Sequence, residues 1–419
     1  MDLARIAWRN LNRNKVRTFI AVLAIATVVA IVVFSRGLMV GFSDSSFRMY
    51  IDNFFGHVRI TDEEYEIREA LLPLEYTVDG FNGRGAEDMI RGIEEIDSVE
   101  SILPRIRFGA LASRDDHLVR MVGVGVDILR ERSHGSLPGN VSRGRMPEEG
   151  NEILVGKGLL EELGADIEGR VTLMFSDVHQ SLRGRTFSIV GIKDTGVAAL
   201  DDNFFYLPIE TARDMLWLED EVTELFVFGT NADRAENLQK DLRAFLSEQG
   251  GEQYSTVVWN QADPFVEVYY EMNKIMNLVY VLFILMGTVV IISTLTMIVR
   301  ERTSEIGMMA ALGLRGREIM KVFVLEGSFM GIIGSLLGVF VGGLITFYYS
   351  IEGLHVDAFA QMSADLELLV EPVFYLAFNL ENLLISFVFG AVIVALACFY
   401  PAFKAAKMEP VEALNYTEE

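Results

Sequence analysis

The chain has 419 residues, 51% of them hydrophobic, and its mean hydropathy is positive. This is too apolar for a typical soluble protein and too polar for membrane helices alone, so we expect membrane anchors combined with one large polar region. Most of the formal net charge of −23 comes from residues 41–272, which hold 44 Asp and Glu against 22 Lys and Arg. So acidic a region excludes nucleic acid as a partner, because phosphates require cationic surfaces.

Residues 1–17 predict an amphipathic helix. Apolar and cationic positions recur there at helical spacing, the apolar ones being Leu3, Ile6, Ala7 and Leu11 and the cationic ones Arg5, Arg9 and Arg13. We expect this helix to lie along the cytoplasmic membrane surface, where its cations meet lipid headgroups.

Four apolar runs predict membrane-spanning helices at 18–40, 273–300, 317–349 and 381–402. Each approaches or exceeds the roughly 20 residues that a helix needs to cross a bilayer. The first run is longer than the roughly 7–15 apolar residues of a signal peptide and lacks a clean cleavage site, so we interpret it as a retained anchor.

Lys and Arg residues predict the orientation of the spans. They cluster before the first span, between the second and third, and after the fourth, whereas residues 350–382 contain none. By the positive-inside rule, both termini, the segment 301–316 and the tail 403–419 are cytoplasmic. The region 41–272 and the loop 350–380 then lie outside.

The outer region 41–272 alternates strand-like and helix-like segments, which predicts an α+β domain of one or two lobes, the second lobe being an insertion at about 115–200. Strands are predicted at 57–61, 117–126, 151–156, 170–175, 186–192, 203–207, 224–230 and 255–259. Helices are predicted at 86–96, 158–163, 209–216, 234–248 and 264–274.

Catalytic and metal-binding motifs are missing from the sequence. The five histidines are scattered, the single cysteine Cys398 permits no internal disulfide, and no HExxH, CxxC or GxSxG motif occurs. The phosphate-binding pattern GxxxxGK[ST] is absent as well. We therefore expect a chain that is not an enzyme and binds no cofactor.

The most informative segment is 299–313, VRERTSEIGMMAALG, between the second and third spans. It begins with charges, continues with apolar residues at helical spacing and closes with a glycine. On the cytoplasmic side, such a segment can contact a partner protein and pass its motion to the spans.

The third span carries small residues every three or four positions, at Gly327, Gly331, Gly334, Gly338 and Gly342. This pattern permits close helix packing, either within the chain or in a dimer. Glu326 precedes the first of them as an intramembrane polar residue, and we expect it to bond to a neighbouring helix rather than to carry protons.

These features together resemble the four-span ABC transporter permeases that include MacB, LolC, LolE and FtsX. The family's cytoplasmic box is matched by Glu301–Gly307 and Ala311–Gly313, its Phe-x-x-Glu-Gly motif by Phe323–Gly327, and its closing motif by Pro401, Ala405, Pro410, Val411, Ala413 and Leu414. The resemblance covers nearly the whole chain. One departure is Met309, where many members carry a basic residue.

The resemblance implies a non-catalytic permease in the bacterial inner membrane. Two permease chains, identical or paralogous, would pair with two copies of an ATPase that binds ATP and Mg²⁺. The coupling helix would lie at 301–316 and move the outer domain, and its contacts would come from Glu301, Arg302, Glu305, Ile306, Met308, Met309, Leu312 and Gly313.

For the substrate, the sequence after the first span looks LolE-like, which favours extraction of lipoproteins and their delivery to a periplasmic carrier. The alternatives are MacB-like export of peptides, toxins or drugs with a membrane-fusion adaptor, and FtsX-like activation of a cell-wall hydrolase.

Overall fold

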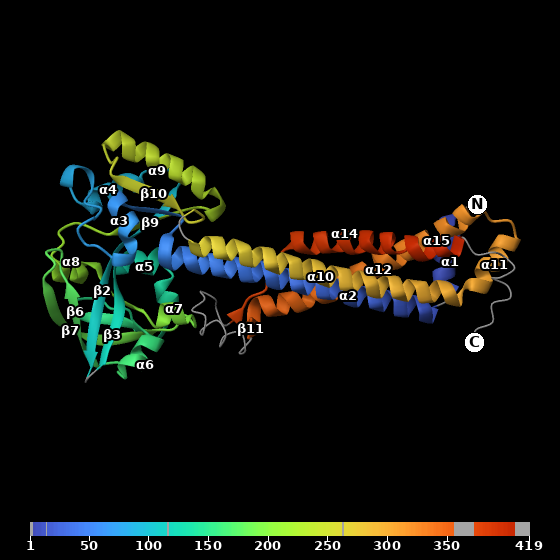
Figure 1. The fold of residues 1–419 in the computed structure, drawn as a ribbon, viewed down its shortest axis with the longest axis horizontal. Helices are drawn as coiled ribbons and strands as arrows, with labels where there is room; N and C mark the ends of the chain where they lie inside the picture. The colour runs from blue at the N-terminus through green and yellow to red at the C-terminus, as the bar shows by residue number, and fades with distance from the viewer. Residues whose placement is uncertain (1–2, 14, 115–116, 262–263, 356–372, 407–419) are drawn as a thin grey trace. The chain divides into compact units, whose positions relative to one another are not determined.

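The structure is a computed structural model that describes residues 3–13, 15–114, 117–261, 264–355 and 373–406. The chain divides into two compact units (Figure 1). We call them the helical unit, which comprises the described residues of Met1–Asp44, Tyr269–His355 and Val373–Glu419, and the sheet unit, which comprises the described residues of Ser45–Val268.

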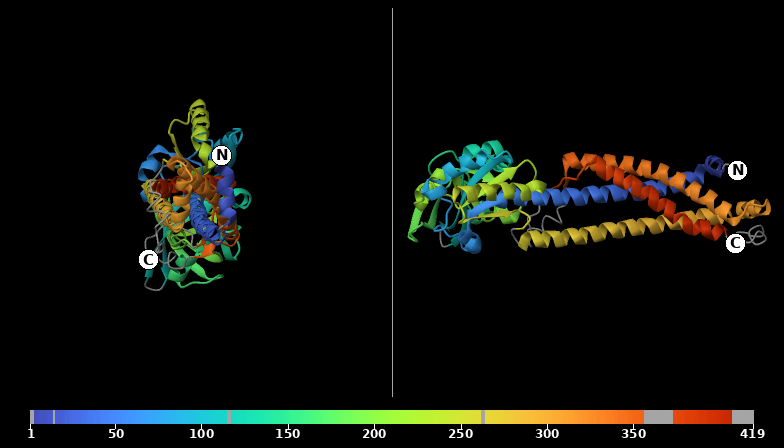
Figure 2. Two further views of the ribbon diagram at one scale, coloured as in Figure 1. Left: turned by 90° about the vertical axis from the view of Figure 1, so that its right-hand side faces the viewer. Right: turned by 90° about the horizontal axis from the view of Figure 1, so that it is seen from above.

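The helical unit is dominated by long apolar helices that run roughly along one direction (Figures 1 and 2). Its elements are α1 Leu3–Arg13, α2 Lys15–Tyr50, α10 Pro264–Glu301, α11 Thr303–Ala311, α12 Gly316–Glu352, α14 Leu380–Ala397 and α15 Phe399–Ala406, with the short strands β11 Leu354–His355 and β12 Val373–Phe374. Four stretches are long and apolar enough to cross a membrane: Lys15–Phe55, Asn273–Glu301, Gly316–Glu352 and Leu380–Lys404.

Several helices extend beyond the predicted bounds. The first span was predicted to end at residue 40, but α2 continues to Tyr50. The helix predicted at 264–274 and the span predicted at 273–300 form one continuous helix, α10. The segment predicted as one helix at 301–316 is instead the end of α10, the nine-residue α11 and a turn. Of the predicted outer loop and tail, residues 356–372 and 407–419 lie outside the described residues.

The glycines of α12 are used for packing within the chain. A Cβ at Gly334, Gly338 or Gly342 would lie 2.6–2.9 Å from atoms of α2, and one at Gly331 would lie 2.9 Å from Val394 of α14. A Cβ at Gly327 would collide with Cys398. Their bare backbones thus let α2 and α14 approach closely. The prediction left open whether these glycines pack inside one chain or form a dimer contact. In the structure, helices of the same chain cover them.

The sheet unit is built on one ten-stranded sheet. Its strands are β1 Val58–Asp62, β2 Val99–Arg114, β3 His117–Val126, β4 Val141–Gly144, β5 Glu152–Gly156, β6 Arg170–Ser176, β7 Leu182–Lys193, β8 Phe204–Pro208, β9 Glu224–Gly229 and β10 Tyr254–Val258. Its helices are α3 Glu63–Arg68, α4 Ala86–Glu94, α5 Ile128–His134, α6 Lys157–Leu163, α7 Ala198–Asp201, α8 Ile209–Leu216 and α9 Ala235–Gln249. Short turns of other helix types are η1 Ile51–Phe55, η2 Glu69–Leu71, η3 Phe81–Gly83, η4 Leu137–Asn140 and η5 Ala232–Arg234.

The sheet has two halves that share β2. In what we call the barrel half, the pairs β2–β3, β3–β8, β8–β5, β5–β7, β7–β6 and β6–β2 close a ring of six strands. In the open half, β9, β1 and β10 extend from residues 99–105 of β2. Apart from β2, the ring consists of strands within 117–208, close to the insertion predicted at about 115–200. The two halves also share one apolar core.

The fold class is as predicted. Four candidate membrane helices accompany a large domain of mixed helices and strands. Alternating burial along the barrel strands places Phe108, Phe187 and Phe205 in the interior, each at most 1% exposed. These aromatic rings fill the closed ring, which is therefore a packed core.

Candidate functional site

The segment from α10 to α12 turns twice within a few residues. Arg302 and Thr303 form the first turn, in which the backbone N–H of Arg302 donates to Val299 O (3.2 Å) and Thr303 Oγ1 donates to Arg300 O (2.6 Å). The second turn follows α11 and contains Gly313, whose φ of +93° is a conformation that favours glycine. α11 is therefore a separate short helix that is covalently tied to two long ones.

The inner face of α11 is apolar. Ile306 is only 1% exposed and packs in a cluster with Val299 of α10, Ile319 and Phe323 of α12, and Ala402 of α15. Met309 is half-buried against the same cluster. Burying a side chain such as Ile306 contributes about 1.5–3 kcal/mol, so this cluster holds α11 against the bundle.

A buried ion pair fixes the start of α11. Arg302 Nη1 lies 2.5 Å from Glu326 Oε2, and the two residues are 5% and 4% exposed. The other oxygen of Glu326 accepts a hydrogen bond from Asn10 Nδ2 of α1 at 2.5 Å. Buried charges persist in folded proteins when they are paired, as Arg302 and Glu326 are.

More exposed ion pairs extend this network outward. Glu305 lies 3.2 Å from Arg302 Nε and 2.7 Å from Arg13 Nη2, while Glu301 lies 2.9 Å from Arg17 Nε. The network thereby joins α1, α2, the end of α10, α11 and α12. Exposed pairs of this kind contribute little stability by themselves, about 0–1 kcal/mol, so the buried pair is the dominant polar contact.

A small cavity lies beside the buried pair. Its volume is about 20 Å³, and Asn10, Thr18, Arg302, Glu326 and Met330 are among its lining residues. Arg302 Nη2 has no hydrogen-bond acceptor in the part of the chain that the structure describes. The cavity is large enough for about one water molecule, which could accept that hydrogen bond.

The outer face of α11 is open. Met308 is 51% exposed and Leu312 is 82% exposed, and their spacing of four places them on one side of the helix. Gly313 is exposed next to them, and Arg315 and Arg317 follow as exposed cations. This is an adaptable apolar surface with a cationic end.

The structure thus divides the eight predicted coupling residues into three groups by their exposure. Met308, Leu312 and Gly313 are exposed and available to a partner, whereas Arg302 and Ile306 are buried. Glu301, Glu305 and Met309 are half-buried. Arg302 and Ile306 lie on the inward face of the segment, so of the eight residues they are the most deeply covered by the chain itself, and the partner contacts of all eight stay a prediction.

Three residues of the site were missed in the sequence, Asn10, Arg13 and Arg17. In the sequence both arginines were interpreted as cations that flank the first span, and Arg13 also as a contact to lipid headgroups. The acidic residues that pair with these arginines, Glu301 and Glu305, lie nearly 300 positions away in the sequence. Only the fold brings the two groups together.

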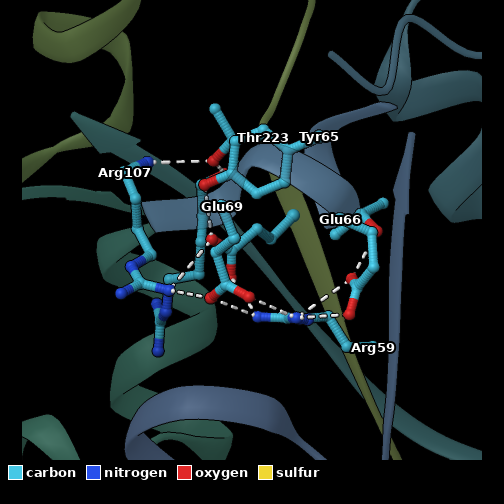
Figure 3. A network of polar contacts seen from close by, with 9 residues as sticks. Arg59, Tyr65, Glu66, Glu69, Arg107 and Thr223 are labelled. Atoms are coloured by element: carbon cyan, nitrogen blue, oxygen red, sulfur yellow. Dashed lines mark hydrogen bonds and ion pairs between the residues drawn. The ribbon is translucent and has the colours of Figure 1, made fainter. Parts of the chain in front are cut away.

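The sheet unit contains a second polar network, in which Arg59 of β1 and Arg107 of β2 hold Glu69 (Figure 3). Arg59 binds both oxygens of Glu69 at 2.7 and 2.8 Å and also reaches Glu66 at 3.0 Å. Glu224 of β9 is fully buried and accepts hydrogen bonds from Tyr65 (2.8 Å) and Arg107 (3.2 Å).

This network fastens α3 and η2 to three neighbouring strands. Burial would raise the pKa of Glu69, but the hydrogen bonds and charges of Arg59 and Arg107 outweigh it, so the pKa lies below its usual value. Burial and the charge of Glu224 raise the pKa of Tyr65 well above its usual value. A fixed carboxylate and a neutral phenol make this a structural network.

Two family models match the chain. The FtsX-like permease C-terminal model covers residues 277–410, and the MacB-like periplasmic core domain model covers residues 18–245, more than half of the chain. These two matches, together with the four candidate membrane helices, define a membrane permease with a periplasmic-type domain. The chain belongs to the family of MacB- and FtsX-like permeases, as the resemblance in its sequence predicted.

The relatives of this chain include proteins named LolC, LolE and MacB. The lipoprotein-releasing system transmembrane protein LolC of Xylella fastidiosa (strain 9a5c) is 26% identical over 275 residues, which is 63% of this chain and 64% of that protein. LolE of Haemophilus influenzae is 23% identical over 350 residues, 78% of this chain and 80% of that protein. The macrolide export ATP-binding/permease protein MacB of Campylobacter jejuni is 26% identical over 265 residues, 61% of this chain and 36% of that protein. The matches to LolC span just under two thirds of that relative's length.

Among solved structures, the extracellular domain of the noncanonic ABC-type transporter YknZ from Gram-positive bacteria is similar with a TM-score of 0.34 and 14% identity, over 48% of this chain and 98% of that chain. The periplasmic region of MacB from Actinobacillus actinomycetemcomitans is similar with a TM-score of 0.33 and 13% identity, over 48% of this chain and 88% of that chain.

Proposed function

We propose that the chain is the permease subunit of an ATP-driven ABC transporter and that α11 couples a separate ATPase to the long helices. The observation that carries this proposal is the two-sidedness of α11. Its outer face offers Met308 and Leu312, while its inner face is held by Ile306 and by the Arg302–Glu326 pair.

This arrangement suits the transfer of force. A partner pressing on Met308 and Leu312 would displace a helix that cannot slide without breaking a buried ion pair. The displacement would therefore pass to α12 through Glu326 and to α10 through the tight turn at Arg302. Such local contacts with a rigid element are how a small movement reaches a distant part of a protein.

The ATPase would be another chain. This sequence contains no GxxxxGK[ST] loop that could hold nucleotide phosphates, so ATP and Mg²⁺ would be bound by the partner. The cationic flanks support an orientation in the bacterial inner membrane with both termini and α11 in the cytoplasm and the sheet unit outside.

A second permease chain would pack against α10. Only 11% of the apolar window of this helix is buried within the chain, compared with 44% for α12. The glycine face of α12 is already covered, so α10 presents the larger unpartnered helix surface. A dimer that buried this face would also place two copies of α11 within one complex.

Release of lipoproteins is the substrate function that we favour. It is supported by relatives named LolC and LolE, which belong to lipoprotein-releasing systems, and by the LolE-like start of the sheet unit. Delivery to a periplasmic carrier would follow. Export is the second candidate, since a relative is named as a macrolide exporter, MacB.

The coupling role is tested by Leu312→Asp. We expect the partner ATPase to co-purify at least about tenfold less well, because a charge replaces an apolar contact on the exposed surface of the segment. Leu129→Asp is the matched control, since Leu129 is 76% exposed on α5 of the sheet unit. If Leu312→Asp left ATPase binding and hydrolysis rates unchanged, the coupling role of α11 would be refuted.

The substrate is tested by depleting the chain and fractionating the envelope. Retention of lipoproteins in the inner membrane is expected. Normal lipoprotein sorting together with new sensitivity to drugs or peptides would favour the export function instead.

A further inference from the structure

A π-helical turn ends the first long helix. This turn, η1, follows α2 directly, and the backbone N–H of Gly56 closes it by donating to Ile51 O at 2.7 Å. Residues 45–55, which include the end of α2 and all of η1, belong to the sheet unit. π-helical turns are rare and occur frequently at functional sites.

The barrel half holds η1 through Asn53 and Phe54. Lys193 of β7 is fully buried, and its Nζ donates to Asn53 Oδ1 at 3.1 Å and to Tyr206 Oη of β8 at 2.7 Å. Phe54 packs edge-on against Phe204 of β8, with 5.8 Å between ring centroids. Two adjacent residues of the turn therefore contact two strands of the closed ring.

The open half holds the next two residues. The guanidinium carbon of Arg59 lies 4.1 Å from the ring centroid of Phe55, and Arg59 is the buried centre of the network in Figure 3. A Cβ at Gly56 would lie 3.0 Å from Phe226 Cβ of β9, so the backbone of the turn rests directly on that strand. Residues 53–56 thus contact both halves in succession.

The hydrogen bonding of the buried Lys193 side chain depends strongly on η1. Among the described residues, no carboxylate oxygen lies within 4.0 Å of its Nζ, and its hydrogen bonds go to one amide and one phenol. A buried ammonium is costly without good partners, so the loss of Asn53 would leave Lys193 with a single acceptor. The position of η1 and the burial of Lys193 are therefore coupled.

We propose that η1 is the joint that passes displacement of α2 into both halves of the sheet unit, with Lys193 as the residue that positions it. This inference rests on the proposed coupling function. A π-helical turn contains about one residue more than an α-helical turn, so its conversion would shift the contacts of residues 53–56 by one position, about 1.5 Å along the helix and 100° around it. Such a conversion would give the joint a second arrangement, distinct from the one in the structure.

Lys193→Met in the full-length protein in nanodiscs tests the joint without any ATPase. Methionine keeps the length and apolar stem of the side chain but cannot donate a hydrogen bond. We expect amide hydrogen exchange at residues 51–56 to accelerate about tenfold, while β3 in the barrel core keeps its protection. Lys157→Met is the matched control, because Lys157 is an exposed lysine paired with Asp194 in the same unit.

Spin labels at Leu182 of the barrel half and Glu248 of α9 give a second measurement. Cys398 is 3% exposed, so it stays unlabelled. We expect Lys193→Met to broaden the distribution of distances between the labels and Lys157→Met to leave it unchanged. If Lys193→Met left either the amide exchange at residues 51–56 or the distance distribution unchanged, the proposal that η1 is a joint would be refuted.

Addition of the ATPase and ATP separates this inference from the proposed function. We expect ATP to shift the distance between the labels in the wild type and the shift to be lost in Lys193→Met. If the amides of η1 are protected in the wild type but ATP does not shift the distance between the labels, the proposed coupling function is contradicted. If ATP still shifts this distance in Lys193→Met, only the proposal that η1 is a joint is contradicted.

Discussion

Arg302 and Glu326 form a buried ion pair across 24 positions of sequence, with 2.5 Å between Nη1 and Oε2. One residue follows the end of α10 and the other lies three turns into α12. Because Glu326 also accepts from Asn10, a single carboxylate fixes the start of α11 and the position of α1.

Glu326→Gln should destabilise the helical unit strongly. The amide still accepts from Asn10, but the buried charge of Arg302 loses its closest counter-charge and keeps only the half-buried Glu305, and breaking a buried pair costs about 3–5 kcal/mol. Thermal unfolding in detergent measures this loss. Glu305→Gln, in a pair with Arg13 that is partly exposed, should cost at most about 1 kcal/mol. Equal effects of the two variants would contradict the special role of the buried pair.

The double variant Arg302→Met with Glu326→Leu should recover much of the stability lost in Glu326→Gln. Apolar residues of similar volume need no charge compensation, and such replacements of buried pairs are often neutral. The same variant should still fail to stimulate ATP hydrolysis if the pair transmits force. Full stimulation would show that the pair is only structural.

Gly338→Ala should destabilise the packing of α12 on α2. The added Cβ would lie 2.6 Å from Ala26 O, a backbone atom that cannot move aside alone. Gly343→Ala is the control, because the nearest atom to its Cβ is 3.4 Å away, in ordinary contact. Alanine is the better helix former by about 1 kcal/mol, so Gly343→Ala should be neutral or stabilising. The melting temperature should therefore fall in Gly338→Ala and stay the same or rise in Gly343→Ala, and an equal fall in both variants would contradict this packing role.

The sheet unit should lose stability in acid in a way that depends on Glu69. The pKa of Glu69 is lowered in the folded protein from 4.5, so its stabilisation is complete above pH 4.5 and is lost as the pH falls through the lower folded pKa. We expect Glu69→Gln to lower stability at pH 7 and to flatten the loss below pH 4.5. Denaturant unfolding followed by tryptophan fluorescence between about pH 3 and 7 measures both slopes. Parallel slopes for wild type and variant would refute this role.

Tyr65→Phe should destabilise the sheet unit by about 1–3 kcal/mol. It removes the hydroxyl that donates to Glu224 Oε1, and a buried carboxylate that loses a donor bears the cost of desolvation. Tyr76→Phe is the control, since that ring packs on Arg68 through its face and keeps this contact without the hydroxyl. A similar unfolding midpoint for both variants would argue against the network.

Local patterns predicted many elements well. The strand expected at 117–126 is β3 and the helix expected at 209–216 is α8, with the same bounds, because alternation and helical spacing are local properties. β2 was not predicted, since Pro104 and Gly109 interrupt its pattern. Its many pairings across the sheet outweigh these local preferences.

The sequence predicted a helix in the segment of the candidate site, but not how that helix is oriented. Helical spacing separates residues 302, 306 and 309 from 304, 308 and 312, yet spacing alone does not reveal which face meets the bundle. That choice comes from α12 and α15, whose Ile319, Phe323 and Ala402 bury Ile306. Contacts such as Asn10 with Glu326 depend on packing across the whole chain, which no local pattern encodes.

The sharing of β2 limits how this protein can be divided. Residues 105–114 pair with β3 along one edge, and residues 110–113 pair with β6 along the other. Excision of the barrel half between residues 115 and 200 would remove both neighbours and expose two unpaired strand edges, which invite aggregation. A chimera that exchanges this half with a relative must therefore carry at least residues 105–114 of β2, and its residues 99–105 must still match β9 of the open half, with which they pair.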